Sequence, residues 1–144
     1  MVVRNKINTT KDLLLNFMMS EGRKSKSEKL FDISLRELQK KNIKNTKLVV
    51  KLSLRNVSPI VSSIRIKRRK MVTLVPFFLK KHNRLSQAIK LIVTNSNSKS
   101  SEFALGLSKE ILDSSNNRGS VKNQVINIHT NSFANKNFSH FRWF

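Results

Sequence analysis

Positive charge is the feature that most limits how this chain can fold. Between residues 38 and 101 the sequence has sixteen Lys or Arg residues and no Asp or Glu. Over the whole chain, 29 basic residues face 8 acidic ones, a net charge of +21 on 144 residues. Such a charge opposes a compact state unless anions neutralise it, and a phosphate backbone supplies anions at close spacing. The composition therefore indicates a polyanionic partner, with nucleic acid as the first hypothesis.

The apolar content is sufficient for one modest core. Hydrophobic residues make up 38% of 144 residues, so we expect one domain spanning residues 1–144. The chain has no Cys, which excludes disulfides and Cys-ligated zinc. Its longest apolar run, residues 71–79, is interrupted by Thr73 and Pro76 and is far shorter than the roughly 20 residues of a spanning helix. We expect no membrane insertion.

Apolar periodicity predicts two short helices in the first third of the chain. The first has the stripe Leu13, Leu14, Phe17 and Met18. We expect it to begin at a Thr10 cap and to end at Gly22. Ser25 and Glu28 have capping-box spacing before a second stripe, which consists of Leu30, Phe31, Leu35 and Leu38. Residues 46–57 fit either a strand or a helix that ends before Pro59.

Residues 60–79 have the pattern of a β-hairpin with a cationic tip. Ile64 and Ile66 alternate with basic residues, and the later half is rich in β-branched and large apolar residues. The tip between the two runs is Arg68, Arg69 and Lys70. Pro76 has no N–H to donate, so we expect it at a sheet edge or a bulge.

Helical periodicity returns in the second half. Its clearest stripe is Leu85, Ala88, Ile89, Ile92 and Val93. We expect a polar loop at residues 94–101, a fifth helix from Glu102 to a stop at Gly119, and a weaker sixth helix at residues 121–138. The phenylalanines on helical stripes are expected in the core: Phe17, Phe31, Phe103 and Phe133.

The sequence shows no arrangement of residues typical of a catalytic site. The acidic residues after the basic block share one predicted helix, near its polar side, and do not converge: Glu102, Glu110 and Asp113. The histidines lack metal-ligand spacing and are interpreted as surface or phosphate-facing residues: His82, His129 and His140. No glycine-rich phosphate loop is present, because the three glycines are far apart. We predict no catalytic residue, no metal and no cofactor.

Structured RNA fits the charge distribution better than a DNA groove, because the basic residues lie on several predicted elements. Two alternatives remain open. One is a sequence-tolerant nucleic-acid packaging protein of an organelle, and the other is a peripheral protein held on anionic lipid. No predicted helix has the broad apolar face of a membrane-surface helix, which disfavours the lipid alternative.

Several segments resemble one family. Residues 19–25, Met-Ser-Glu-Gly-Arg-Lys-Ser, with Glu28-Lys29-Leu30, are similar to a Gly-Lys-Lys-Ser-x-x-Glu region. Further matching segments follow in the same order: Asn56-Val57-x-Pro59, Val75-Pro76, Arg84 with residues 88–93, residues 118–122, and residues 129–143. Together they resemble the family of the seventh protein of the small ribosomal subunit, from about residue 10 to the end. The C-terminal motif is the most specific.

The resemblance implies a mainly α fold, a single domain of about six helices with a protruding β-hairpin, at about residues 62–79, between the third and fourth. It assigns residues 46–57 to a helix. Family members bind the 3′ major domain of small-subunit ribosomal RNA, nucleate assembly of the subunit head, and line the exit-site tRNA and mRNA path. The implied partners are therefore that rRNA, exit-site tRNA, mRNA, and neighbouring head and platform proteins. The family is non-enzymatic and has no cofactor.

The RNA-binding residues follow from the resemblance and from charge. The resemblance gives Arg23, Lys24, Ser25, Lys67, Lys80, Arg84, Lys90, Arg118, Lys122, Lys136 and Arg142. Charge adds Arg4, Lys6, Arg65, Arg68, Arg69 and Lys70. The residues expected beside tRNA or mRNA are Arg68, Arg69, Lys70, His140, Arg142 and Trp143. In an ordered last helix Lys136 and His140, four residues apart, would point the same way.

Two departures from the family pattern affect this prediction. Arg69-Lys70 stands where adjacent glycines are usual, and Lys122-Asn123-Gln124 has fewer charges than the usual basic cluster at the start of the last helix. The basic and aromatic tail, about residues 138–144, resembles organellar and especially mitochondrial versions. The amino-acid composition is typical of an AT-rich genome, and the N-terminus leaves no room for a removable presequence. We therefore expect a mitochondrial ribosome, with a plastid or the bacterial cytoplasm as alternatives.

Overall fold

A computed structural model describes residues 5–41, 45–68, 71–99 and 102–141. These residues form a mainly helical single domain. Its elements are α1 (Asn5–Met18), α2 (Lys24–Lys40), α3 (Thr46–Val57), β1 (Val61–Arg68), β2 (Met71–Phe78), α4 (Lys81–Lys99), α5 (Phe103–Ser115), α6 (Ser120–Ala134) and the 3₁₀-helix η1 (Lys136–Phe141). The predicted hairpin between α3 and α4 and the helix at residues 46–57 are confirmed.

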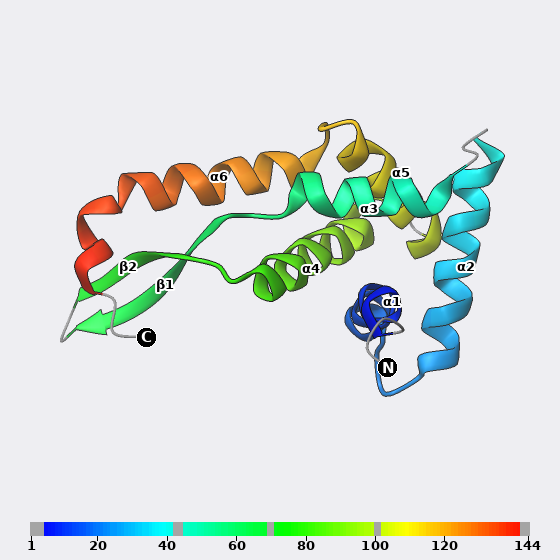
Figure 1. Cartoon of the computed structure of the whole chain (residues 1–144), viewed down its shortest axis with the longest axis horizontal. Coiled ribbons are helices and arrows are strands. Elements are labelled where there is room, and N and C mark those ends of the chain that lie inside the picture. Colours follow the sequence, from blue (N-terminus) through cyan, green and yellow to red (C-terminus); the bar gives the residue numbers. More distant parts are fainter. Residues whose placement is uncertain (1–4, 42–44, 69–70, 100–101, 142–144) are drawn as a thin grey trace.

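The helical body is built around α5, which packs against α2, α3 and α4. Leu107 and Ile111 of α5 are fully buried, as predicted from their spacing. The hydrophobic cluster around them takes residues from all six α-helices: Leu14, Leu15, Phe31, Leu38, Leu54, Val57, Ala88, Ile89, Ile92, Val93, Leu107, Ile111, Val121 and Val125. Figure 1 shows this body on one side of the molecule and the hairpin on the other, with α6 running between them.

The hairpin is exposed at its tip and partly buried toward its base. β1 and β2 pair antiparallel from Val61 opposite Phe78 to Arg68 opposite Met71. Val75 and Pro76 are buried near the base, whereas Met71 is 71% exposed. Each strand of a two-stranded sheet is an edge, so the predicted edge position of Pro76 is confirmed. η1 packs against β2.

α4 is longer than predicted, because residues 94–99 continue the helix and do not form a polar loop. The buried stripe of Ile92 and Val93 goes on through Asn95 and Ser96, which are also buried. Asn95 and Gln124 of α6 exchange two side-chain hydrogen bonds, of 2.8 and 3.0 Å. Because exposed Gln124 satisfies the amide of buried Asn95, burying Asn95 costs little, and a polar side chain extends the core here.

Two predicted helix starts are wrong. α1 begins at Asn5, which places Thr10 inside the helix. α2 begins at Lys24 with Arg23 at the N-cap and no side-chain capping hydrogen bond, so Ser25 lies in the first turn and forms no capping box. Both helices are fixed by buried apolar side chains such as Leu15 and Phe31, which outweigh a cap worth about 1 kcal/mol.

The end of α5 is also different from the prediction. Asn117 has a positive φ of 56°. Its N–H donates to Ser114 O at 3.2 Å and the Arg118 N–H donates to Asp113 O at 2.8 Å, the pattern of a Schellman motif. Gly119 is instead the N-cap of α6. That helix ends at Ala134, not at residue 138.

Two of the four stripe phenylalanines lie in the core or against it, and two do not. Phe31 is buried and Phe103 packs against the core cluster, but Phe17 is 40% and Phe133 71% exposed. Phe133 follows buried Ser132 and points about 100° away from the buried face of α6. Glu110, expected near the polar side of its helix, is fully buried.

Candidate nucleic-acid interface

The turn between α1 and α2 forms one wall of a surface cavity. Glu21 and Gly22 both have positive φ, 54° and 71°, and this reversal brings the start of α2 close to the end of α1. The Arg23 N–H donates to Ser20 O at 3.1 Å and closes the turn. The cavity has a volume of about 380 Å³ and is lined by Phe17, Met18, Met19, Ser20, Arg23, Lys26, Ser27, Leu30, Val93, Asn97 and Phe103.

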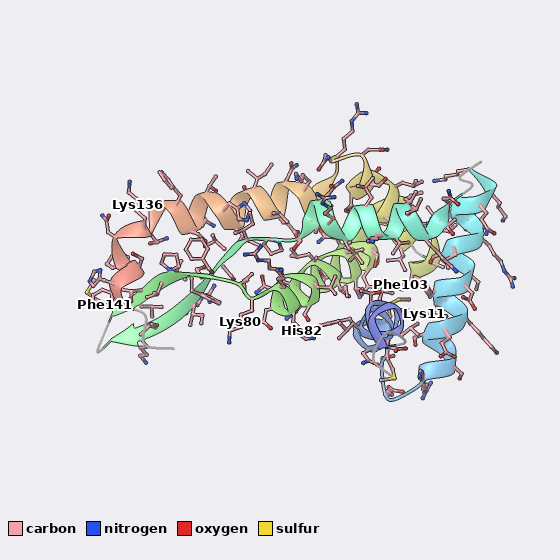
Figure 2. All side chains as sticks on the ribbon, viewed as in Figure 1. Lys11, Lys80, His82, Phe103, Lys136 and Phe141 are labelled. Carbon is pink, nitrogen blue, oxygen red and sulfur yellow. The ribbon has the colours of Figure 1, made fainter. Side chains whose placement is uncertain are left out.

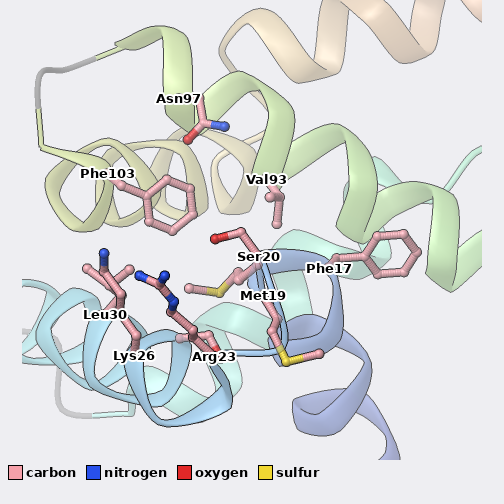
Figure 3. A pocket seen from close by; sticks show the side chains of 11 residues that line it. Phe17, Met19, Ser20, Arg23, Lys26, Leu30, Val93, Asn97 and Phe103 are labelled. Carbon is pink, nitrogen blue, oxygen red and sulfur yellow. The ribbon is translucent and has the colours of Figure 1, made fainter.

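The cavity combines an apolar interior with cations at its side. Figure 3 shows the Phe103 ring facing the α1–α2 turn, with Arg23 and Lys26 on the opposite wall and Asn97 above. Arg23 pairs with Glu21 at 2.7 Å, but both side chains are more than 60% exposed. Such a pair is weak and a phosphate can replace it. An aromatic ring beside two cations suits a base with its adjacent phosphate.

A second group of predicted residues lies at the base of the hairpin. Arg84 donates from Nε to Leu79 O at 2.9 Å, and its own N–H donates to Lys80 O at 3.0 Å. These bonds join the end of β2 to the first turn of α4. Lys80 is exposed, and Figure 2 shows it on the same edge of the molecule as His82. Lys90, farther along α4, is also exposed.

On the hairpin itself, Arg65 and Lys67 are exposed on β1. They are two residues apart and so share one face of the strand. Lys6 lies in α1 and Arg68 ends β1. The remaining predicted residues lie outside the described ranges: Arg4, Arg69, Lys70, Arg142 and Trp143.

Lys122, by contrast, has an internal partner. Its Nζ donates to Asn56 O at 3.2 Å, at the end of α3. The Asn56 side chain donates in turn to Ser114 O and Ser115 O, at 3.2 and 2.9 Å, so these residues join α3, α5 and α6. Arg118 is exposed in the short α5–α6 connection.

At the C-terminal end, the described aromatic and basic side chains contact one another. Lys136 Nζ lies 4.8 Å from the centroid of the Phe133 ring. In η1, Phe138 and Phe141 stack with centroids 6.1 Å apart, and His140 is tilted against Phe141 at 4.1 Å. A 3₁₀-helix aligns residues three apart, so it pairs Phe138 with Phe141 and does not align Lys136 with His140 as a continuous α-helix would.

The predicted residues therefore form separate groups. Arg23, Lys24 and Ser25 lie at the α1–α2 turn, the second group surrounds the hairpin base, and Lys136 begins η1 (Figure 2). The α5–α6 connection lies on the opposite long edge from the start of α4 (Figure 1). The prediction omitted Lys26, although it lies one turn after Arg23 in the same basic run. Asn97 had no sequence signal and Phe103 was expected only as a core residue, because only tertiary packing brings the two side chains to the α1–α2 turn.

In the described ranges, no three His, Cys, Asp or Glu side chains form a group that could hold a metal ion. No helix within them is long and apolar enough to cross a membrane.

Comparison with known proteins gives a consistent result over most of the chain. A family model described as Ribosomal protein S7p/S5e matches residues 3–136. The small ribosomal subunit protein uS7m of Reclinomonas americana is 29% identical over 130 residues, which cover 90% of this chain and 82% of that protein. The uS7 protein of Oleidesulfovibrio alaskensis is 33% identical over 133 residues, 90% and 83% of the two chains. That of Bdellovibrio bacteriovorus is 35% identical over 142 residues, 92% and 88%.

Proposed function

Because this chain belongs to the S7p/S5e family of ribosomal proteins, which are non-enzymatic RNA-binding components of the small subunit, we propose that it binds the 3′ major domain of small-subunit rRNA and nucleates assembly of the subunit head. The family match over residues 3–136 is the observation on which this proposal rests. The net charge of +21 and the several exposed basic groups support it, since a folded RNA can neutralise separated groups at once.

The α1–α2 cavity is the most specific contact in this proposal. Arg23 and Lys26 bind phosphates at its side, and one unpaired base enters against Phe103. Recognition of RNA depends on such splayed bases, because the deep groove of an RNA helix is closed to side chains. The exposed residues Lys80, Lys90 and Arg65 bind backbone phosphates and add affinity without reading sequence.

The hairpin and the C-terminal segment line the exit-site tRNA and mRNA path. Two observations support this part of the proposal: the hairpin projects from the helical body, and η1 packs against β2 at the same end of the molecule. One functional surface can therefore include Arg65, Lys67 and His140. The other proposed partners are neighbouring proteins of the head and platform.

We propose the mitochondrial ribosome as the place of action. The similarity to uS7m of Reclinomonas americana supports it, together with the aromatic tail. Bacterial uS7 proteins are similarly related, at 33% and 35% identity, so a plastid or bacterial ribosome is the alternative.

Equilibrium binding to two RNAs tests the rRNA proposal. The cognate RNA is the 3′ major domain, and the comparison is an unrelated structured RNA of equal length. Affinity for both should fall with salt, with a log–log slope of roughly 0.7 to 0.9 per phosphate neutralised, while the preference for the cognate RNA persists. Equal binding at moderate salt would contradict the proposal and favour the packaging alternative.

Variants at the cavity make the test residue-specific. Phe103→Leu retains an apolar side chain against the core but removes the ring, so binding to the cognate RNA should weaken by about 1–3 kcal/mol and the preference should shrink. Arg23→Gln with Lys26→Gln should affect the cognate RNA more than Lys47→Gln with Lys51→Gln, a matched pair of exposed α3 lysines. Equal losses for the two pairs would exclude a special role of the cavity.

A further inference from the structure

α6 presents an outer face with almost no charge. Residues 119–135 contain one charged side chain, Lys122, although 26% of the whole chain is charged. The Lys122 ammonium is directed to the Asn56 carbonyl, 3.2 Å away, and is half-buried. The exposed side of this helix therefore differs from the rest of a strongly basic protein.

The same face carries exposed apolar groups. Ile126 is 48% exposed and Phe133 71% exposed. Seven residues apart, they lie on one side of the helix about 10 Å from each other, with exposed Thr130 between them. Ile60 is 50% exposed and joins this side, because its N–H donates to His129 Nε2 at 3.2 Å. We call Ile60, Ile126, Thr130 and Phe133 the α6 outer face.

The absence of charge on the α6 outer face indicates what kind of partner it binds. RNA binding to a surface depends on cations that neutralise phosphates, and this face has none along its length. Lys136 at 4.8 Å from the Phe133 ring marks its far end, where the basic C-terminal segment begins. Uncharged surfaces with exposed aromatic and aliphatic side chains are typical of the centres of protein–protein interfaces.

We propose that the α6 outer face docks a neighbouring protein of the small subunit, through a segment that presents apolar side chains to Ile126 and Phe133 and a hydrogen-bonding group to Thr130. The ribosomal setting rests on the proposed function. The choice of protein over RNA rests on the charge and exposure of this face.

Photo-crosslinking in purified, assembled subunits tests the proposal. A benzophenone amino acid replaces Thr130 on the α6 outer face, or Lys90 on α4 as the control. From position 130 we expect a crosslink to one identified subunit protein, and its yield should fall by about tenfold when Ile126→Ala and Phe133→Ala are added. A crosslink from position 130 to rRNA, or no crosslink, would overturn the proposal. Failure of position 90 to crosslink to rRNA would count against the proposed function alone.

Charge insertion gives an independent readout. Thr130→Lys should lower incorporation into subunits by about tenfold in competition with the unmodified chain, because a charge at an apolar interface loses its solvation. Asn131→Lys adds the same charge to an exposed position of α6 about 100° away and should incorporate normally. Equal or better incorporation of Thr130→Lys would show that RNA or solvent covers the face and would overturn the proposal.

Discussion

His129 in α6 accepts a hydrogen bond at Nε2 from the main-chain N–H of Ile60, 3.2 Å away and 69 positions earlier in the chain. Two turns before His129 in α6, Lys122 donates from Nζ to the carbonyl of Asn56 at 3.2 Å. These two side chains hold both ends of the connection from α3 to β1. Because that connection leads directly into the hairpin, α6 orients the hairpin relative to the helical body.

Replacing His129 with Leu should loosen the base of the hairpin. The Ile60 N–H would lose its acceptor, at a cost of about 0.5–1.5 kcal/mol in the free energy of unfolding. Amide exchange at Ile60 should accelerate more than exchange within α5. His82→Leu, a change at an exposed histidine of α4, serves as the control. Unchanged exchange at Ile60 in His129→Leu would contradict the structural role of this bond.

Two glycines in positive-φ conformations should respond differently to Ala. Gly119 has φ 96° and ψ 174°, a region almost restricted to glycine, and an added Cβ would lie 2.9 Å from Asp113 Cβ. Gly119→Ala should therefore cost at least about 2 kcal/mol. Gly22→Ala, with φ 71° and no atom within 4 Å of the new Cβ, should cost about 1 kcal/mol. Urea unfolding in phosphate buffer measures both, and a larger loss at Gly22 would contradict the assigned geometry.

The sequence predicted the helical body where the core is apolar. Ile89, Ile92 and Leu107 recur at helical spacing, and burial enforces that spacing. Prediction failed where buried side chains are polar. Asn95 has the polarity of a loop residue, and its hydrogen bonds with Gln124, 29 residues later, allow it to lie buried within a helix.

The candidate interface was predictable to a similar extent. A run of charge identifies Arg23 and Lys24 in the sequence, because adjacent basic residues reveal an electrostatic surface without reference to the fold. The cavity beside them also requires Asn97 and Phe103, which come from α4 and α5. Their approach depends on tertiary packing of helices far apart in sequence. The roles of the individual basic residues in RNA binding remain predictions.

Truncation after Asn137 should leave the helical body folded but weaken incorporation into subunits. The core cluster contains no residue of η1, so helical content by circular dichroism should be nearly unchanged. Loss of the stacked Phe138 and Phe141 uncovers β2, against which η1 packs, and removes the basic and aromatic tail. Competition with the full chain during subunit assembly measures the effect. Equal incorporation would refute a role of the tail in RNA or tRNA contacts.

Replacing Arg68, Arg69 and Lys70 with Ser should separate assembly from translation. Arg68 ends β1 and pairs with Met71, which is the last described pair of the hairpin. Residues 69 and 70 lie outside the described ranges. Three adjacent cations repel one another unless phosphate is near, so their expected partner is tRNA or mRNA. Assembly should be spared, because the proposed rRNA contacts lie on the helices and at the hairpin base, around Lys80 and Arg84.

The same mutant preparation supplies both readouts for this hairpin variant. Particle yield reports head assembly, and retention of deacylated tRNA in the exit site reports the tip. Lys47→Ser with Lys51→Ser, which removes two exposed charges from α3 far from the hairpin tip, is the control and should retain tRNA normally. We expect normal yield with reduced tRNA retention, since the lost contacts act only on a bound tRNA. A variant that fails to assemble, or one that assembles and retains tRNA normally, would contradict this division of labour between the hairpin tip and the helical body.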